Sequence, residues 1–335
     1  MEERKRLSSR ADREAIAAIL TRRLQDEGDA ASIDTIKCLS YLNEAAASGS
    51  VKLFSSYISW FRCQKSPDGH SLRNCLNILR LIISESIEHD DLPAILRPID
   101  TALAELAHNT ELSACLIPAE SPHTGLATSY LSALLAGNRR EAQRLVYEGL
   151  EHISIRDLYL SVFQPVQREV GRLWQINKIS VAEEHFCTAA TQSIMIDLYP
   201  RIISSQRIGK TVVAACVGSE LHEIGIRMVV DFFEMAGWDT YYLGAGVRRE
   251  DLIMAIDERK ADLVALSATM TYHVENVRNL VAEIRDASPR TSLKIMVGGL
   301  PFNNVPNLWR EVGADLWATD AEQALQCIQN SDHRE

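Results

Sequence analysis

The stretch Cys216-Val-Gly-Ser-Glu-Leu-His-Glu-Ile-Gly225 decides the fold of the last third of this 335-residue chain. It begins at the end of the apolar, β-branched run 211–217 and leads into a segment with apolar residues at helical spacing. An apolar run that stops at a glycine and resumes as an amphipathic helix is typical of the first strand–helix turn of a parallel α/β domain. Ligands bind at the carboxyl ends of the strands in such sheets. We therefore expect His222 to lie where a ligand is met, and the alternative is a loop histidine without a task.

The rest of this third repeats the same alternation of short apolar runs and helical segments. Five strand–helix units in a row predict a flavodoxin-like, doubly wound parallel sheet over residues 208–330. The expected strands are 211–217, 239–243, 263–267, 293–297 and 316–319, and the later helices lie near 250–259, 273–287, 305–312 and 321–330.

Small or polar residues follow three of the expected strands. His222 comes after the first strand, Ser267 ends the third, and Gly298-Gly299 follows the fourth. These strand ends can meet at one crevice although they are far apart in the sequence. Paired glycines let the backbone approach a bulky ligand closely, and Gly225 leaves space between helix and sheet. Ser267 adds a small hydroxyl at the same edge.

The motif Glu220-x-His222-x-x-Gly225, followed by a serine and a glycine pair, resembles the cobalamin-binding domain, whose pattern is Asp-x-His-x-x-Gly. The resemblance implies that His222 replaces dimethylbenzimidazole as the lower cobalt ligand. Imidazole suits cobalt, and a carboxylate on the other ring nitrogen would fix the tautomer. Glu220 stands where aspartate is usual, which puts that link in doubt. The positions implied to line the slot for the nucleotide tail are Gly225, Ser267, Gly298 and Gly299.

Composition narrows the class of protein. Hydrophobic residues make up 46% and charged residues 24% of the chain, as in globular proteins. A net charge of −10 argues against direct DNA binding. The seven cysteines show no CxxC spacing and are expected to be reduced. The N-terminus has no apolar signal region and no run has membrane-spanning length, so we expect a cytoplasmic protein without a membrane partner.

Two helical regions precede the α/β domain. Apolar residues at helical spacing predict an all-helical domain over residues 1–117, with a last helix near 95–106 that has Pro93 in its first turn. After a linker at 117–125, a four-helix bundle is expected over 126–200. Its helices are predicted at 128–135, at 140–150, at 154–174 with a kink at Pro165, and after the capping-box pattern Ser180-x-x-Glu183.

Within the bundle, Trp174 closes one helix and Glu184-His185 opens the next. The plain interpretation is a buried tryptophan with a capping pair. Directly before a cobalamin domain, however, a Trp-x9-Glu-His bundle resembles the light-sensing cobalamin regulators of the CarH type. The resemblance implies that Trp174, Glu184 and His185 cover the upper corrin face and accommodate the 5′-deoxyadenosyl group of adenosylcobalamin. The light-dependent DNA-binding members carry a histidine directly after the tryptophan, whereas this chain has Gln175.

The N-terminal domain does not resemble the winged helix-turn-helix of the CarH-type repressors. Its aromatic pattern and helix count look like the globin-like, haem-free domain of the photocobilins, which combine biliverdin with cobalamin. The resemblance implies non-covalent bilin binding, and the alternative is a dimerisation bundle with an ordinary aromatic core. The candidate bilin contacts are Tyr41, Tyr57, Trp60, Arg62, His70 and Arg73.

Taken together, these resemblances imply a cobalamin-dependent photoreceptor without enzymatic activity. Light would change the upper cobalt ligand, and the change would alter contacts with an unknown protein partner or within a homo-oligomer. One alternative is a corrinoid protein that carries methyl groups for a methyltransferase, which also has a helical bundle before its cobalamin domain. The other is a light-independent anti-repressor that senses cobalamin or haem.

Overall fold

The computed structural model describes residues 7, 9–26, 33–65, 70–87, 90–107, 115–203, 206–288 and 292–332. The chain divides into two compact units, Met1–Leu112 and Ser113–Glu335. Each unit has its own core. None of the described helices is both long enough and apolar enough to cross a membrane.

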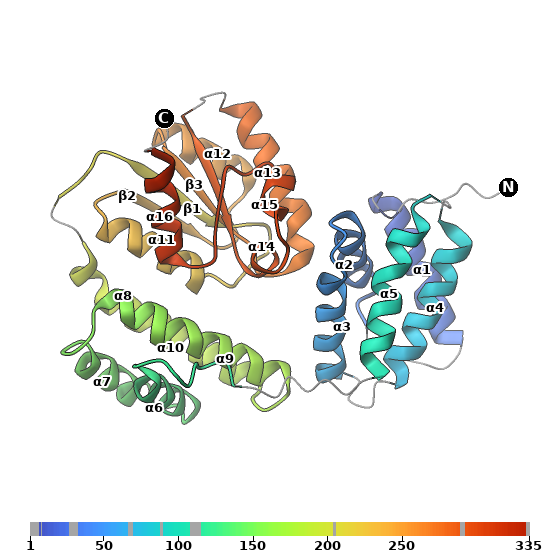
Figure 1. Ribbon diagram of the computed structural model, residues 1–335, viewed down its shortest axis with the longest axis horizontal. Helices are drawn as coiled ribbons and strands as arrows, with labels where there is room; N and C mark the ends of the chain where they lie inside the picture. Colours follow the sequence, from blue (N-terminus) through green and yellow to red (C-terminus); the bar gives the residue numbers. More distant parts are fainter. Residues whose placement is uncertain are drawn as a thin grey trace. The chain divides into compact units, whose positions relative to one another are not determined.

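The described part of the first unit is all-helical, which confirms that part of the predicted fold class (Figure 1). Its apolar residues face inward at helical spacing, and the rings of Tyr41 and Tyr57 are buried and stacked with centroids 4.2 Å apart. The last helix begins at Leu92 with Pro93 in its first turn, as predicted. The helices are α1 (Arg10–Asp26), α2 (Thr35–Ala47), α3 (Val51–Lys65), α4 (His70–Ser86) and α5 (Leu92–Ala107).

The second unit begins with the predicted helical bundle. The capping box at Ser180 and Glu183 is present, with the hydroxyl of Ser180 accepting from the Glu183 N–H and the Glu183 carboxylate accepting from the Ser180 N–H. Buried apolar side chains from all of its long helices form one core. The helical segments are α6 (Thr124–Leu135), α7 (Arg139–Gly149), α8 (Ile155–Leu158), η1 (Tyr159–Phe163), α9 (Gln164–Gln175) and α10 (Val181–Ile202).

The expected kink at Pro165 takes the form of a π-helical turn. Residues Tyr159–Phe163 form this turn, and the Gln164 N–H donates to the carbonyl of Tyr159, five residues back. Proline has no N–H and its ring displaces the preceding turn, so the helix widens just before it. The wide turn leaves Tyr159 fully buried.

The second unit continues as a five-stranded parallel sheet with strand order β2-β1-β3-β4-β5, which confirms the flavodoxin-like prediction (Figure 1). Helices α11 and α16 pack on one face, where their apolar residues share a core with β1 and β3. The strands are β1 (Thr211–Cys216), β2 (Asp239–Gly244), β3 (Leu263–Ser267), β4 (Lys294–Gly298) and β5 (Leu316–Ala318). The helices are α11 (Ile224–Met235), α12 (Arg249–Glu258), α13 (Val274–Ala287), α14 (Leu300–Asn304), α15 (Leu308–Glu311) and α16 (Ala321–Asp332).

One prediction within this domain was wrong. A single helix was expected over 305–312, but two short helices, α14 and α15, lie between β4 and β5. Pro306 separates them because it lacks an N–H, and Asn307 takes a left-handed conformation with φ of 64° at the start of α15.

Polar contacts attach the bundle to the sheet domain. The hydroxyl of Tyr159 donates to Asp231 Oδ2 at 2.9 Å, and Arg227 Nε donates to Asp231 Oδ1 at 3.0 Å. Arg156 on α8 forms an ion pair with Glu322 on α16 at 3.0 Å. Burial raises the pKa of Asp231 against the opposing effect of Arg227. The middle of the bundle is therefore fixed on α11 and α16.

Candidate functional site

Register brings two predicted site residues, Ser267 and Gly298, together at the carboxyl edge of the sheet. Cys216 of β1 pairs with Ser267 of β3, Ser267 pairs with Gly298 of β4, and Gly298 pairs with Ala318 of β5. These residues form one row across four strands. The loop that carries His222 leaves β1 directly above this row, so the expected meeting of strand ends is present.

The glycines at this edge serve different purposes. A Cβ atom built on Gly225 would meet no atom within 4 Å, so space is open beside the start of α11. Gly299 has φ of 107°, and a Cβ atom there would lie 2.0 Å from the carbonyl oxygen of Ala268. Gly299 is therefore required by the backbone itself, whatever ligand binds nearby. A Cβ atom on Gly298 would make an ordinary contact of 3.4 Å with the Ala318 oxygen.

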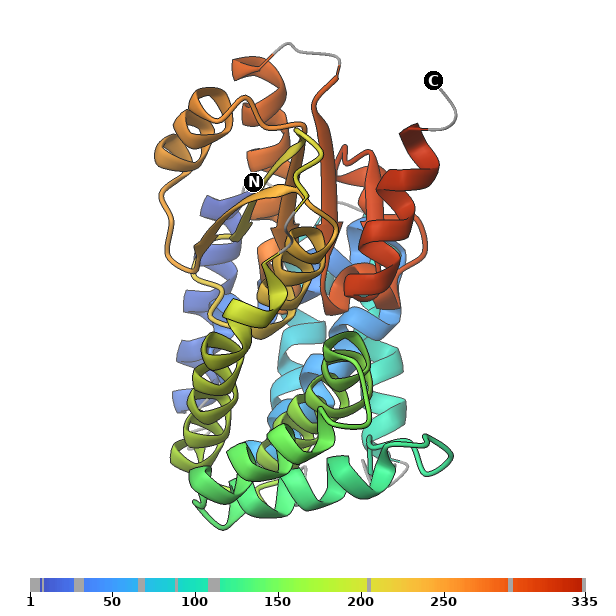
Figure 2. The ribbon, with the colours of Figure 1, turned by 90° about the vertical axis from the view of Figure 1, so that its left-hand side faces the viewer.

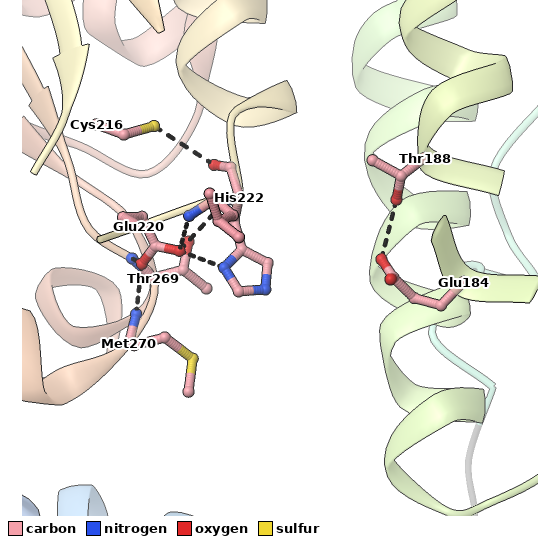
Figure 3. Close-up of polar contacts among 8 residues, drawn as sticks. Glu184, Thr188, Cys216, Glu220, His222, Thr269 and Met270 are labelled. Atoms are coloured by element: carbon pink, nitrogen blue, oxygen red, sulfur yellow. Dashed lines mark hydrogen bonds and ion pairs between the residues drawn. The ribbon is translucent and has the colours of Figure 1, made fainter. Parts of the chain in front are cut away.

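Glu220 links the histidine loop to the neighbouring strand end (Figure 3). Its Oε1 accepts from Nδ1 of His222 and from the backbone N–H groups of Leu221 and His222, the latter two at 3.1 Å. Its Oε2 accepts from the N–H groups of Thr269 and Met270 at 2.6 and 2.9 Å. The longer arm of glutamate thus reaches both the ring and the loop after β3.

The pKa values of this pair follow from the same contacts. Burial of Glu220, which is 1% exposed, would raise its pKa, but hydrogen bonds from His222, Met270 and Thr269 lower it to about 2. The hydrogen bond to Glu220 raises the pKa of His222 against the effect of burial, and the charge of Glu184 raises it further. Glu220 is therefore an anion that holds a proton on Nδ1 of His222.

This arrangement presents the other nitrogen of the ring. The His222 side chain is 55% exposed, and Figure 3 shows its second ring nitrogen on the side far from Glu220, where Glu184 lies on α10. In the neutral imidazole with Nδ1 protonated, Nε2 carries the free lone pair. An imidazole nitrogen fixed by a carboxylate on its other side is a suitable ligand for cobalt. Leu221 and Leu300 expose 75% and 53% of their surface, which suits an apolar macrocycle.

The second predicted motif lies at the start of α10. Glu184 Oε2 and Nδ1 of His185 are 2.5 Å apart, and the Thr188 hydroxyl donates to Glu184 Oε1 at 2.9 Å. The His185 side chain is 75% exposed, whereas that of Glu184 is 23% exposed. Trp174 is half-buried near the end of α9. The charge of Glu184 acts on His222, and Figure 3 shows Glu184 on the side of the His222 ring that is far from Glu220.

The bilin candidates lie in the first unit. Tyr41 and Tyr57 are buried in its core, Arg62 on α3 is half-buried, and Arg73 on α4 is exposed. The side chains of Trp60 and His70 lie outside the described residues. The stacked tyrosines serve the core, as in the plainer interpretation, and a bilin contact by these residues stays a prediction.

Two parts of this chain match known families of cobalamin-binding domains. Residues 210–326 match the family described as B12 binding domain, and residues 126–198 match a second family with the same description. Together with the histidine site, these matches support cobalamin binding by this chain.

Several proteins similar to this chain are named as corrinoid proteins. Dimethylamine corrinoid protein 1 of Methanosarcina acetivorans is 27% identical over 162 residues, which are 47% of this chain and 74% of that protein. Dimethylamine corrinoid protein 3 of Methanosarcina mazei is 28% identical over 161 residues, which are 48% of this chain and 92% of that protein. The structure of the Methanosarcina barkeri monomethylamine corrinoid protein shares the fold, with a TM-score of 0.55 at 21% identity over 61% of this chain and 97% of that chain.

Proposed function

We propose that this chain is a corrinoid carrier protein, with His222 as the lower cobalt ligand and the upper cobalt face turned toward the start of α10. In this function, the bound cofactor supplies a cobalt that accepts a methyl group and releases it to a partner methyltransferase. We prefer this function, which was the first alternative from the sequence, to that of a photoreceptor. The similarity of this chain to proteins that are named dimethylamine corrinoid proteins supports this choice.

The observation that carries the proposal is the fixed ring of His222. Glu220 accepts hydrogen bonds from two loops and cannot turn away from the ring without leaving partly buried N–H groups without their partner. The chain therefore holds Nε2 in one direction before any ligand binds, which reduces the entropy lost on binding. Glu184, Thr188 and His185 offer polar groups on the opposite side of the site.

Methyl transfer tests the proposal. The full chain, loaded with cobalamin and reduced, is expected to accept a methyl group from a methylamine when a methylamine:corrinoid methyltransferase is added in the dark. The absorption spectrum should change to that of methylcobalamin, and the His222→Ala variant should react more slowly. A spectrum that stays unchanged with several such enzymes, while free cobalamin is methylated in the same mixture, argues against the carrier.

A light-dependent function is a second candidate, because Glu184 and His185 pair at the start of α10 in a motif that resembles the light-sensing regulators. In this version the adenosyl group packs against Trp174, whose ring offers a large apolar face. Trp174→Ala should then lower the preference for adenosylcobalamin over methylcobalamin by about tenfold, the size expected for one lost aromatic contact.

The control for this prediction is Trp309→Ala, which removes a tryptophan on α15, away from the bundle. Equal preference in the parent chain and in Trp174→Ala, measured by competition between the two cobalamins, would leave the light-dependent candidate without support. A carrier is expected to bind both forms alike and to keep its size on illumination.

A further inference from the structure

The histidine loop, residues 217–223, rests on a second histidine that belongs to the next strand–helix connection. This residue, His273, ends the short helix η2 (Thr271–His273) between β3 and α13, and only 2% of its surface is exposed. A Cβ atom built on Gly218 would lie 2.9 Å from Nδ1 of His273 and 3.1 Å from Nδ2 of Asn276. The backbone of the histidine loop therefore lies directly against these two side chains.

The contact at Gly218 requires glycine for two reasons. Its φ of 68° lies in the left-handed region, and a side chain there would also press on the ring of His273. The ring is rigid and buried, so it has no flexible end that could move aside. The residue before Gly218 is fixed as well, because the N–H of Val217 donates to the Ser267 carbonyl at 3.0 Å and continues the pairing of β1 with β3. The close approach is therefore built into the end of β1.

The ring of His273 is itself held from several sides. Nδ2 of Asn276 donates to its Nδ1 at 3.1 Å, and Oδ1 of Asn276 accepts from Arg249 at 3.5 Å, which fixes the orientation of the amide. The ring of Tyr272 packs on that of His273 with centroids 4.3 Å apart. Helices α12 and α13, which carry Arg249 and Asn276, lie side by side next to the strands at the upper left of Figure 2. His273 is therefore a fixed support for the loop.

We propose that His273 is a positioning residue for His222, because it supports the histidine loop at Gly218. This inference rests on the proposed function, in which His222 binds cobalt, and it adds to Glu220 a second residue that fixes where the imidazole lies. His273 acts through the backbone of the loop. A ligand group that is held in place before binding loses less entropy when it binds.

Two contacts with the segment after β3 define the position of the loop, whereas one would not. Glu220 is attached to this segment by hydrogen bonds from the N–H groups of Thr269 and Met270. A loop attached only there could still turn about the attachment. The contact at Gly218, two residues earlier in the chain, prevents that turn. Because His222 lies two residues after Glu220, both contacts together set the direction of its Nε2.

Removal of the ring tests the proposal in the full chain. The chain is labelled with ¹⁵N-histidine and loaded with unlabelled cobalamin, so that a protein imidazole on cob(II)alamin gives a nitrogen doublet in electron paramagnetic resonance, and dimethylbenzimidazole gives a triplet. His273→Ala should lower the cobalamin affinity by about tenfold, the lower end of what lost support of a metal ligand costs. Part of the bound cobalamin should then show the triplet. A variant that is only less stable would keep the doublet, so the spectrum separates positioning from packing.

The conservative variant His273→Asn is the matched control for His273→Ala. An asparagine amide oxygen can take the place of Nδ1, where it would accept from Asn276 and keep an atom against Gly218. This variant also removes part of the ring and leaves a cavity in the same place. It should nevertheless keep the doublet and lose less affinity than His273→Ala.

Gly218→Ala tests the same contact from the other side. The added methyl group would press on the ring of His273, so the affinity should fall by about tenfold and the triplet should appear. When His273 is already alanine, the effect of Gly218→Ala should shrink to about threefold or less, because the ring is gone. The control is Gly137→Ala between α6 and α7, since Gly137 has nearly the same φ, 67°, and a Cβ atom there would meet nothing within 4 Å. It should keep the affinity and the doublet.

The outcomes distinguish this inference from the proposed function. A doublet in the parent chain that persists at full affinity in His273→Ala and Gly218→Ala would overturn the inference and leave His222 as the lower ligand. Equal effects of Gly218→Ala with and without the ring of His273, or equal losses in His273→Asn and His273→Ala, would overturn it as well. A triplet in the parent chain would contradict His222 as the lower ligand, and the inference would fail together with that assignment.

Discussion

Replacing His222 with alanine should weaken cobalamin binding by the full chain by on the order of 100-fold, the upper end of what lost ligand support costs a metal site. The variant removes the imidazole that Glu220 holds in place and leaves the rest of the sheet edge intact. The bound cobalt should then show a spectrum without an imidazole ligand. Equilibrium titration followed by absorption spectroscopy measures both the affinity and the ligand set.

The matched control is His152→Ala, which removes an exposed histidine after α7 and should leave binding unchanged. If His222→Ala keeps the affinity and the cobalt spectrum of the parent chain, His222 is not the lower ligand and the assignment fails.

Replacing Glu220 with glutamine should lower cobalamin affinity by roughly 10–100-fold, because the side chain orients the ligand rather than touching cobalt. Glutamine has the same length but only one accepting oxygen, whereas the glutamate accepts from His222 and from two separate loops. The partly buried N–H group of Thr269 or of Met270 would then lose its partner.

Glu220→Gln should also change how the free energy of unfolding depends on pH in acid. The pKa of Glu220 is lowered to about 2 in the folded chain from an ordinary value of 4.5, so its carboxylate stabilises the fold above pH 4.5. This contribution, about 3 kcal/mol, is lost as the pH falls from about 4.5 to about 2. The free energy of unfolding without cofactor should therefore fall less steeply over this range in Glu220→Gln than in the parent chain.

Glu283→Gln serves as the control for both measurements, since it removes only an exposed ion pair with Arg249 between α12 and α13. It should keep both the cobalamin affinity and the acid dependence of the parent. Identical acid profiles for Glu220→Gln and the parent chain would show that the carboxylate is not held as the structure indicates.

Much of the fold follows from local sequence patterns. The five strands were placed within about one residue at each end because buried parallel strands are continuous apolar runs bounded by turn residues. The two short helices near Pro306 were not predicted. A single turn residue interrupts the helix there, but the composition of the surrounding apolar segment stays the same. The capping box at Ser180 was predictable since it depends only on residues three apart.

The site was predictable only in part. The row of Cys216, Ser267 and Gly298 follows from parallel register, and strand ends can be aligned from the sequence. The anchoring of Glu220 could not be foreseen, because its partners at Thr269 and Met270 are backbone N–H groups that any residue would supply. The departure from aspartate at this position, which put the link in doubt, is explained by the extra length that reaches the second loop.

Electron paramagnetic resonance of the cob(II)alamin form tests the central claim most directly. The full chain is prepared with ¹⁵N-labelled histidine and loaded with unlabelled cobalamin, so that only a protein imidazole can place a ¹⁵N nucleus on the cobalt axis. If His222 is the lower ligand, the nitrogen splitting should change from a triplet to a doublet on labelling, and the doublet should vanish in His222→Ala. A triplet that persists in the labelled protein would mean that the dimethylbenzimidazole of the cofactor still binds the cobalt, and would contradict the account.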